Sequence, residues 1–168
     1  MILFKKLMKN NSHIIFDEDS KISSKLKKIS KANKLKNLNL GIKNSKLKII
    51  DHKFLNQYQK VTFSYKGKVF NFSTKLVGEI QIKNLLMSIL AALKSNIPLK
   101  KIINCVKKIN PVPGRFEKIG NLKNNSIVVL DYAHTPDALE ICLKNLKDQF
   151  KLRKINLVFG CGGERDKP

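Results

Sequence analysis

The fold of this chain is decided by one stretch, Ile127-Val128-Val129-Leu130-Asp131-Tyr132-Ala133-His134-Thr135-Pro136-Asp137-Ala138-Leu139. Its first four residues are a continuous apolar run, which predicts a buried strand that delivers an Asp and a His to the start of a helix. We expect Thr135 to be the N-cap of that helix, with Pro136 at the first helical position and Asp137 complementing the helix dipole. A strand, a polar loop and a helix in this order are how α/β proteins build a nucleotide site.

The helix is expected to bury one stripe of residues at helical spacing, formed by Leu139, Cys142, Leu143, Leu146 and Phe150. A second apolar run, 155–159, then leads directly into the glycine-rich segment 160–166. These elements predict a β-α-β unit whose strands carry polar or glycine-rich loops at their C-terminal ends, the edge where open α/β sheets hold ligands. The sequence therefore predicts the α/β fold class.

A proline-rich joint at 110–114 divides the chain into two parts, residues 1–110 and 111–168, because its prolines can continue neither a helix nor a central strand. The first part is expected to contain a lysine-faced helix, antiparallel strands, a helix that is buried nearly all round and a shorter helix. Their expected ranges are 17–33, 46–74, 84–95 and 99–109. The turn between two of the strands is predicted at Lys66-Gly67-Lys68.

The composition is strongly basic, since 34 Lys and Arg residues stand against 12 Asp and Glu residues and give a formal net charge of +22. A polyanion partner is one interpretation, but nearly all of the charge is lysine, which is poorer than arginine at bidentate recognition of phosphates and bases. The lysines are also spread along the chain rather than clustered. We therefore favour a solvated surface over dedicated nucleic-acid binding, and expect only weak electrostatic binding to nucleic acid at low salt.

Cysteine usage and hydropathy bear on the cellular compartment. Cys105, Cys142 and Cys161 do not pair by spacing and suit a reducing cytosol, and the first two are interpreted as structural. No apolar run approaches the length of about 18 residues that a membrane-spanning helix needs. The sequence therefore predicts a soluble cytoplasmic protein with no membrane partner.

Three motifs carry a resemblance to a known family. They are Pro113-Gly114-Arg115-Phe116-Glu117, the segment 131–139 and the segment 159–167, in this order along the chain. Together they resemble the Mur ligases, and among these the UDP-N-acetylmuramyl-tripeptide synthetase (MurE) type. Weaker similarity to the family's middle region lies at 3–7 and 14–19. Three motifs in the right order are far more specific than any one of them.

The resemblance implies both a fold and a function. Residues 1–110 would be the C-terminal part of a Mur ligase central ATPase domain, and residues 111–168 the first β-α-β unit of a Rossmann-like C-terminal domain. The implied function is that of a fragment of an ATP-dependent amide ligase, which adds the third amino acid to UDP-N-acetylmuramoyl-L-alanyl-D-glutamate in peptidoglycan synthesis. The implied cofactors are ATP and Mg²⁺, and the implied partners are the UDP-N-acetylmuramoyl-dipeptide and an amino acid.

The family's P-loop, its magnesium ligands and its amino-acid recognition motif are expected outside this chain. A P-loop reads Gly-x-x-x-x-Gly-Lys-Ser/Thr, whereas the only Gly-Lys pair here, Gly67-Lys68, is followed by Val69. We therefore expect the isolated chain to be inactive, and the choice between diaminopimelate and lysine as the third residue stays open. Arg165 and Asp166 are left without a role. We also expect the incomplete first part to leave apolar surface of the 85–93 helix partly exposed.

The resemblance implies four nucleotide-binding residues and neither a catalytic residue nor a metal ligand in this chain. The four are Asn84, Arg115, Asp131 and His134. Asn84 matches the family asparagine that contacts adenine, Arg115 would bridge phosphates across the joint, and Asp131 would contact the ribose or its neighbourhood. His134 is interpreted as an ATP-binding residue rather than a general base.

Structural roles are the alternatives for these residues. Asn84 is placed near the start of the buried helix and is a candidate cap, and Arg115 has Glu117 and Asp131 as candidate salt-bridge partners. Asp131 is a candidate helix-capping acid, and a lone His before a helix is more often structural than catalytic. For the whole chain, the alternatives are a non-catalytic nucleotide-binding module or half of a split enzyme, and a lysine-rich nucleic-acid-binding protein.

Overall fold

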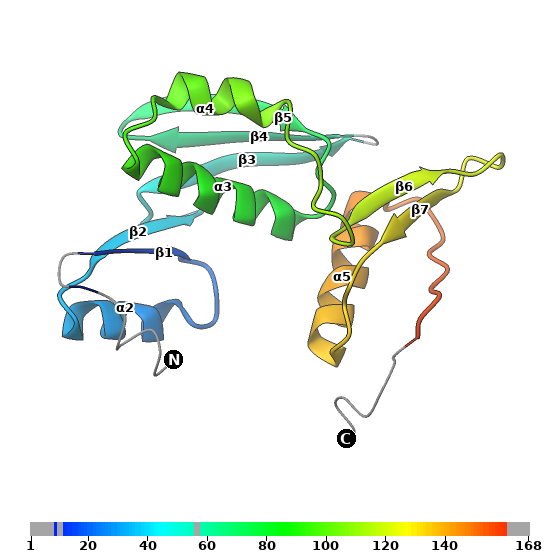
Figure 1. Cartoon of the computed structure of the whole chain (residues 1–168), viewed down its shortest axis with the longest axis horizontal. Helices are drawn as coiled ribbons and strands as arrows, with labels where there is room; N and C mark the ends of the chain where they lie inside the picture. Colours follow the sequence, from blue (N-terminus) through cyan, green and yellow to red (C-terminus); the bar gives the residue numbers. More distant parts are fainter. Residues whose placement is uncertain (1–8, 10–11, 56–57, 161–168) are drawn as a thin grey trace.

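The computed structural model describes residue 9 and residues 12–55 and 58–160, which form two sheets with their helices (Figure 1). The larger sheet has the order β1-β2-β3-β4-β5, with strands β1 (His13–Asp17), β2 (Lys36–Gly41), β3 (Leu47–Leu55), β4 (Tyr58–Tyr65) and β5 (Lys68–Thr74). The smaller sheet pairs β6 (Glu117–Asn121) with β7 (Ile127–Leu130). The helices are α2 (Ser23–Ala32), α3 (Glu79–Lys94), α4 (Leu99–Val106) and α5 (Pro136–Gln149).

The larger sheet is mixed. β1 runs parallel to β2, from His13 opposite Lys36 to Asp17 opposite Leu40, and α2 lies in the crossover that a parallel pair requires. β2 also runs parallel to β3, whereas β3, β4 and β5 form an antiparallel meander. The antiparallel strands predicted over 46–74 are therefore confirmed, and β2 is a strand that the sequence reasoning did not find.

The helix predicted over 17–33 begins later than expected. Asp17 is the last residue of β1, and its carbonyl oxygen accepts a hydrogen bond of 2.8 Å from Ser20 Oγ in the turn that follows the strand. α2 begins only after this turn. Ile29 lies in the core, whereas Ile22 is 57% exposed because it lies before the first turn of the helix.

The β4–β5 hairpin has a two-residue turn. Tyr65 pairs with Lys68, and Lys66 and Gly67 between them have φ angles of 50° and 76°. Two positive φ angles are what a type I′ turn requires, and the twist of that turn matches the twist of the strands. The predicted turn is confirmed, and it places Gly67-Lys68, the only Gly-Lys pair of the chain, in a hairpin.

α3 lies across the larger sheet and closes the main core (Figure 1). Five side chains of α3 are buried and pack against apolar residues of the strands: Ile82, Leu85, Leu86, Ile89 and Leu90. The prediction of a buried helix is confirmed. The expectation that the 85–93 helix leaves apolar surface exposed is wrong for these side chains, because the strands of this chain already form a sheet wide enough to cover them.

The second part contains β6, β7 and α5. Thr135 is the N-cap of α5, since its Oγ1 accepts a hydrogen bond of 3.3 Å from Ala138 N, and Pro136 and Asp137 lie in the first turn as predicted. Cys142 is buried and Leu146 packs against the same cluster, so the expected stripe of α5 faces a small core.

Two predictions for the second part are wrong. Residues 155–159 do not form a strand, and β7 is only half-buried, with Leu130 47% exposed. A strand needs a neighbour for its backbone groups, and among the described residues β7 pairs only with β6. The β-α-β unit therefore lacks its second strand among the residues that the structure describes.

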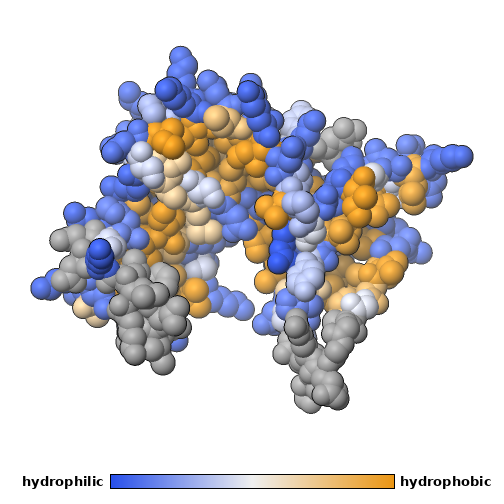
Figure 2. Space-filling view, in the orientation of Figure 1, coloured by the Kyte–Doolittle hydropathy of each residue, from blue (hydrophilic) through white to orange (hydrophobic). Residues whose placement is uncertain are grey.

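Apolar surface of the second part is exposed as a result (Figure 2). Leu152 and Val158 are 103% and 98% exposed, and apolar side chains of β7 add to this surface. Of the cysteines, Cys142 is buried and Cys105 is exposed, while Cys161 lies outside the described residues, as do Arg165 and Asp166. No helix in the described part of the chain is long and apolar enough to cross a membrane.

Candidate functional site

The start of α3 is held by a buried polar network. Gly78 is the N-cap of α3, with φ 83°, and offers no capping side chain. On one side, Gln59 of β4 donates through Nε2 to the carbonyl oxygens of Leu76 (2.7 Å) and Gly78 (3.2 Å). His52 Nε2 lies 2.7 Å from the remaining polar atom of that amide, Gln59 Oε1. The peptide groups before α3 are therefore fixed to the sheet.

On the other side, α5 satisfies amides at this same helix start. Gly78 N donates to Gln149 Oε1 at 2.6 Å, and Ile80 N donates to Asn145 Oδ1 at 3.1 Å. The first amides of a helix have no partner within the helix, so side chains from elsewhere must supply one. Residues that are 71 and 65 positions apart in sequence thereby join the two parts of the chain.

An apolar cluster packs beside these hydrogen bonds. Val77 from the first part is buried together with Phe116 and Cys142 from the second, and Ile80 and Leu146 pack around them. Burial raises the pKa of the Cys142 thiol to about 11, with a further contribution from the negative charge of Asp131. The thiol is therefore protonated at neutral pH and acts as a small apolar side chain.

Asp131 organises the loop after β7. Its Oδ2 accepts a hydrogen bond from Phe116 N and its Oδ1 accepts one from Ala133 N, each at 2.9 Å. Tyr132 N donates to the Gly114 carbonyl oxygen at 2.9 Å, which adds a second hydrogen bond between this loop and the segment 114–116. Asp131 does not cap α5, because Thr135 does so.

Arg115 and His134 converge on Tyr132. The Arg115 guanidinium lies 5.0 Å from the centre of the Tyr132 ring, and the His134 ring lies edge-on to it at 5.3 Å. His134 Nδ1 is 3.0 Å from the Tyr132 carbonyl oxygen. Within residues 12–55 and 58–160, Arg115 forms no salt bridge with Glu117 or Asp131.

The Arg115, Tyr132 and His134 side chains together have the chemistry of a phosphate-binding group. A cation over an aromatic face is attractive, and the planar guanidinium still presents donors that match phosphate oxygens. Sequence reasoning did not single out Tyr132, although its position between Asp131 and His134 in the motif was an available signal; the structure adds that its side chain is exposed. Of the predicted residues, Arg115, Asp131 and His134 are thus brought together by two short segments.

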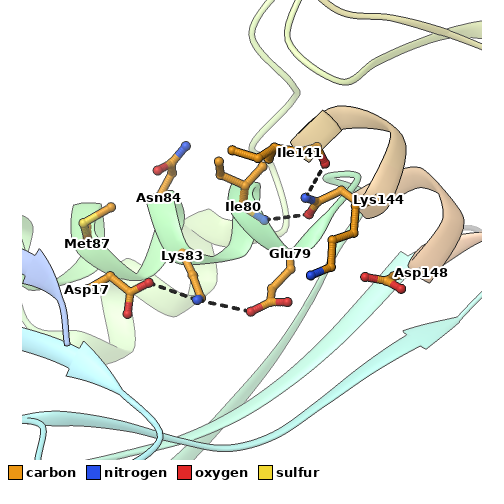
Figure 3. Close-up of a pocket in the computed structure, with 10 residues that line it drawn as sticks. Asp17, Glu79, Ile80, Lys83, Asn84, Met87, Ile141, Lys144 and Asp148 are labelled. Atoms are coloured by element: carbon orange, nitrogen blue, oxygen red, sulfur yellow. Dashed lines mark hydrogen bonds and ion pairs between the residues drawn. The ribbon is translucent and has the colours of Figure 1, made fainter. Parts of the chain in front are cut away.

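Asn84 belongs to a different surface. It lies inside α3 and is exposed, so it does not cap the helix. Asn84 lines a pocket of about 380 Å³ between the end of β1, α3 and α5 (Figure 3). Arg115, Asp131 and His134 are not among the residues that line this pocket. The lining residues are Asp17, Glu79, Ile80, Lys83, Asn84, Met87, Ile141, Lys144, Asn145 and Asp148.

Lys83 is the charged centre of this pocket. Its Nζ lies 2.9 Å from Asp17 Oδ2 and 3.3 Å from Glu79 Oε1, and Figure 3 shows it between the two carboxylates. Burial works to lower the pKa of Lys83, but hydrogen bonds and attraction from Asp17 and Glu79 outweigh it, so the pKa is raised. Within the described part of the chain, no group of three or more His, Cys, Asp and Glu side chains is arranged to hold a metal ion.

Comparison with known proteins gives consistent matches. The Mur ligase middle domain matches residues 1–92, and the Mur ligase glutamate ligase domain matches residues 114–168. A UDP-N-acetylmuramoyl-L-alanyl-D-glutamate–2,6-diaminopimelate ligase of Rickettsia felis is 41% identical over 111 residues, which cover 65% of this chain and 20% of that protein. The chain thus spans about a fifth of the length of this curated relative.

Solved structures share the fold. A ligase of the same printed name superposes with a TM-score of 0.66 at 27% identity, over 92% of this chain and 32% of that chain. A MurF ligase of Thermotoga maritima in complex with ADP superposes with a TM-score of 0.69 at 18% identity, over 83% of this chain and 31% of that chain.

Proposed function

The chain belongs to the Mur ligase family, and we propose that it forms the adenosine side of the ATP site and the joint between two domains of a 2,6-diaminopimelate-adding ligase. In this proposal residues 1–110 belong to the middle domain and residues 111–168 to the C-terminal domain. The choice of diaminopimelate over lysine rests on the name of the Rickettsia felis relative. The protein would then act in peptidoglycan synthesis.

One observation carries the assignment of the ATP site. The Arg115 guanidinium, which forms no salt bridge within the described residues, stacks on the exposed Tyr132 ring beside His134, on a loop that Asp131 holds against the joint. A planar cation beside aromatic rings suits phosphates and a stacked base or ribose. The ADP-bound neighbour of the same fold is consistent with nucleotide use.

Each predicted residue then has a proposed role. Arg115 would bind phosphate oxygens, and His134 with Tyr132 would contact the nucleoside without acting as a general base. Each oxygen of Asp131 already accepts one backbone amide and keeps acceptor capacity for a ribose hydroxyl. Asn84 would contact adenine from α3, across the pocket that separates α3 from α5.

The proposed reaction is carboxylate activation followed by amide formation. The γ-phosphoryl group of ATP passes to the carboxylate of the UDP-linked dipeptide, ADP leaves, and the amine of the third residue displaces phosphate from the acyl phosphate. Mg²⁺ would neutralise charge on the transferred phosphoryl group, but we assign it no ligand, because the described residues contain no suitable cluster. We also propose that the 168-residue chain alone does not turn over ATP, because its Gly67-Lys68 pair lies in the β4–β5 hairpin rather than in a phosphate-binding loop.

Kinetics on the full-length ligase that contains this sequence test the site. Arg115→Ala and Asp131→Asn are expected to lower kcat/KM for ATP by about one to two decades, because losing a charged hydrogen bond costs on the order of 1.5 to 3 kcal/mol. Arg115→Lys should recover little, since a point charge does not replace the planar fork. The KM for the dipeptide should change much less.

Arg153 provides the matched control. It is an exposed arginine of the second part whose Nη1 donates to the Asn125 carbonyl oxygen at 2.6 Å, away from the Tyr132 group. Arg153→Ala should leave ATP kinetics unchanged. Near-normal ATP kinetics in all three site variants would reduce Arg115 and Asp131 to structural residues of the joint.

A further inference from the structure

The hydrogen bonds between α5 and the start of α3 have a role that the proposed ATP site does not yet include. We propose that Asn145 and Gln149 form a latch on the amides of Ile80 and Gly78, and that this latch sets the position of the second part on the first. The proposal rests on the proposed function in one respect: the latch would bring Asn84 on α3 and Arg115 at the joint into the relative position that ATP requires.

The latch is built from one face of α5. Residues four positions apart in a helix lie on the same face, so Asn145 and Gln149 reach the α3 start side by side. Asn145 Nδ2 donates to the Ile141 carbonyl oxygen at 2.8 Å, which fixes the amide so that Oδ1 faces Ile80 N. Gln149 is only 7% exposed, and its Oε1 accepts from Gly78 N in a buried setting.

Gly78 is shaped for this contact. A Cβ at this position would lie 3.1 Å from both Asn145 Cβ and Asn145 Oδ1 and 3.3 Å from Phe116 Cε1, and the φ of 83° disfavours other residues. Its carbonyl oxygen is held by Gln59 of β4 while its N–H is held by Gln149 of α5. One glycine therefore connects the larger sheet to the second part through both of its polar backbone groups.

The latch fixes the orientation of α5 on α3, which the neighbouring apolar cluster does not. Val77, Phe116 and Cys142 favour docking of the two parts, but apolar packing is not directional. Hydrogen bonds to two amides, those of Gly78 and Ile80, define how far α5 slides and turns on α3. Because α3 carries Asn84 and α5 directly follows the Asp131–His134 loop, that position also sets the separation of the two sides of the proposed ATP site.

The first experiment needs no nucleotide. In the 168-residue chain, Asn145→Leu with Gln149→Leu should speed hydrogen exchange of the Gly78 and Ile80 amides by at least about tenfold, because both lose their acceptors. Amides in the middle of β4 should be unaffected. Asn104→Leu, at an exposed position of α4, is the control. Unchanged exchange at residues 78 and 80 in the double variant would overturn the latch whatever the enzyme does.

The second experiment uses the KM for ATP to test whether the latch positions the two parts of the chain for nucleotide binding. In the full-length ligase, Gln149→Leu should raise the KM for ATP by about tenfold, while the KM for the dipeptide and the kcat change little. Gln149→Glu keeps an acceptor oxygen and should therefore restore ATP binding. A normal KM for ATP in Gln149→Leu, when Arg115→Ala is impaired, would overturn the positioning role. Near-normal ATP kinetics in Arg115→Ala, Arg115→Lys and Asp131→Asn would instead reject the proposed ATP site, and faster exchange in the double variant would still support the latch itself.

Discussion

Glu18 ties three elements together through one carboxylate. It accepts hydrogen bonds from Lys27 of α2 and from Asn39 of β2, directly after the last residue of β1. The hydrogen bond from Lys27 lowers the pKa of Glu18 below its ordinary value of 4.5, and Asn39 adds to this, although burial opposes it. A carboxylate whose pKa is lower in the folded state adds stability above its unfolded pKa, and that stability is lost as the pH falls through the folded value.

The predicted effect is an acid-dependent loss of stability at this corner. Between pH 6 and pH 3 the unfolding midpoint of the unaltered chain should fall more steeply than that of Glu18→Gln, which cannot ionise. Thermal unfolding followed by circular dichroism at several pH values measures this, with Glu140→Gln, an exposed carboxylate of α5, as the control. Parallel pH profiles for the unaltered chain and Glu18→Gln would contradict the assignment.

At the scale of elements, the β4–β5 turn offers a clean test of backbone strain. A methyl group at Gly67 would meet no atom within 4 Å, so the cost of Gly67→Ala comes from the φ of 76° alone. We expect the free energy of unfolding to fall by about 1 kcal/mol. Gly120→Ala is the matched control, because it also meets nothing within 4 Å and has no positive φ. Denaturant unfolding in which both variants lose equal stability would reject the explanation.

Elements with local signals were the ones that the sequence could predict. The Thr135-Pro136 cap, the two-residue hairpin turn and the apolar run of α3 depend on neighbouring residues only, and all are present. β2 was not predicted because it is short and its pairing with β1 joins residues 23 positions apart, from His13 opposite Lys36 onward. The 155–159 run resembles a strand, but forming one requires a neighbour that the described residues do not supply.

The same reasoning explains what was found of the candidate site. Three residues of the motifs, Arg115, Asp131 and His134, lie on two segments that the Phe116–Asp131 hydrogen bond and the Tyr132 ring bring together. The latch residues Asn145 and Gln149 gave no signal, because their partners on α3 are 65 and 71 positions away. Their roles depend on how the two parts pack, which no local pattern encodes.

At the scale of the whole molecule, the two parts differ in how well they bury their apolar side chains. The larger sheet and α3 enclose a continuous core, whereas the second part exposes Leu152, Val158 and apolar residues of β7. Exposed apolar patches bind hydrophobic dyes and favour aggregation. The net charge of +22 opposes aggregation at low salt through repulsion between molecules.

We therefore predict that dye binding comes from the second part. Leu152→Ser with Val158→Ser should reduce the fluorescence of a bound hydrophobic dye and leave the unfolding midpoint unchanged. Leu86→Ala, in the enclosed core, should instead lower the free energy of unfolding by about 2 to 5 kcal/mol. Dye fluorescence and calorimetry on the purified chain measure both effects. Undiminished dye binding in the double serine variant would place the exposed surface elsewhere.

Gln59 also decides where a proton resides on its neighbour. Both hydrogens of its amide point to carbonyl oxygens, those of Leu76 and Gly78, so Oε1 can only accept. The atom that faces Oε1 is His52 Nε2, which must therefore carry hydrogen, and the neutral imidazole is held as the Nε2–H tautomer with its lone pair on Nδ1. The position of the Leu76 and Gly78 carbonyl oxygens before α3 therefore determines, through the buried Gln59 amide, which nitrogen of the neutral His52 ring carries hydrogen. Among the described residues, this is the one polar connection between β3 and the start of α3.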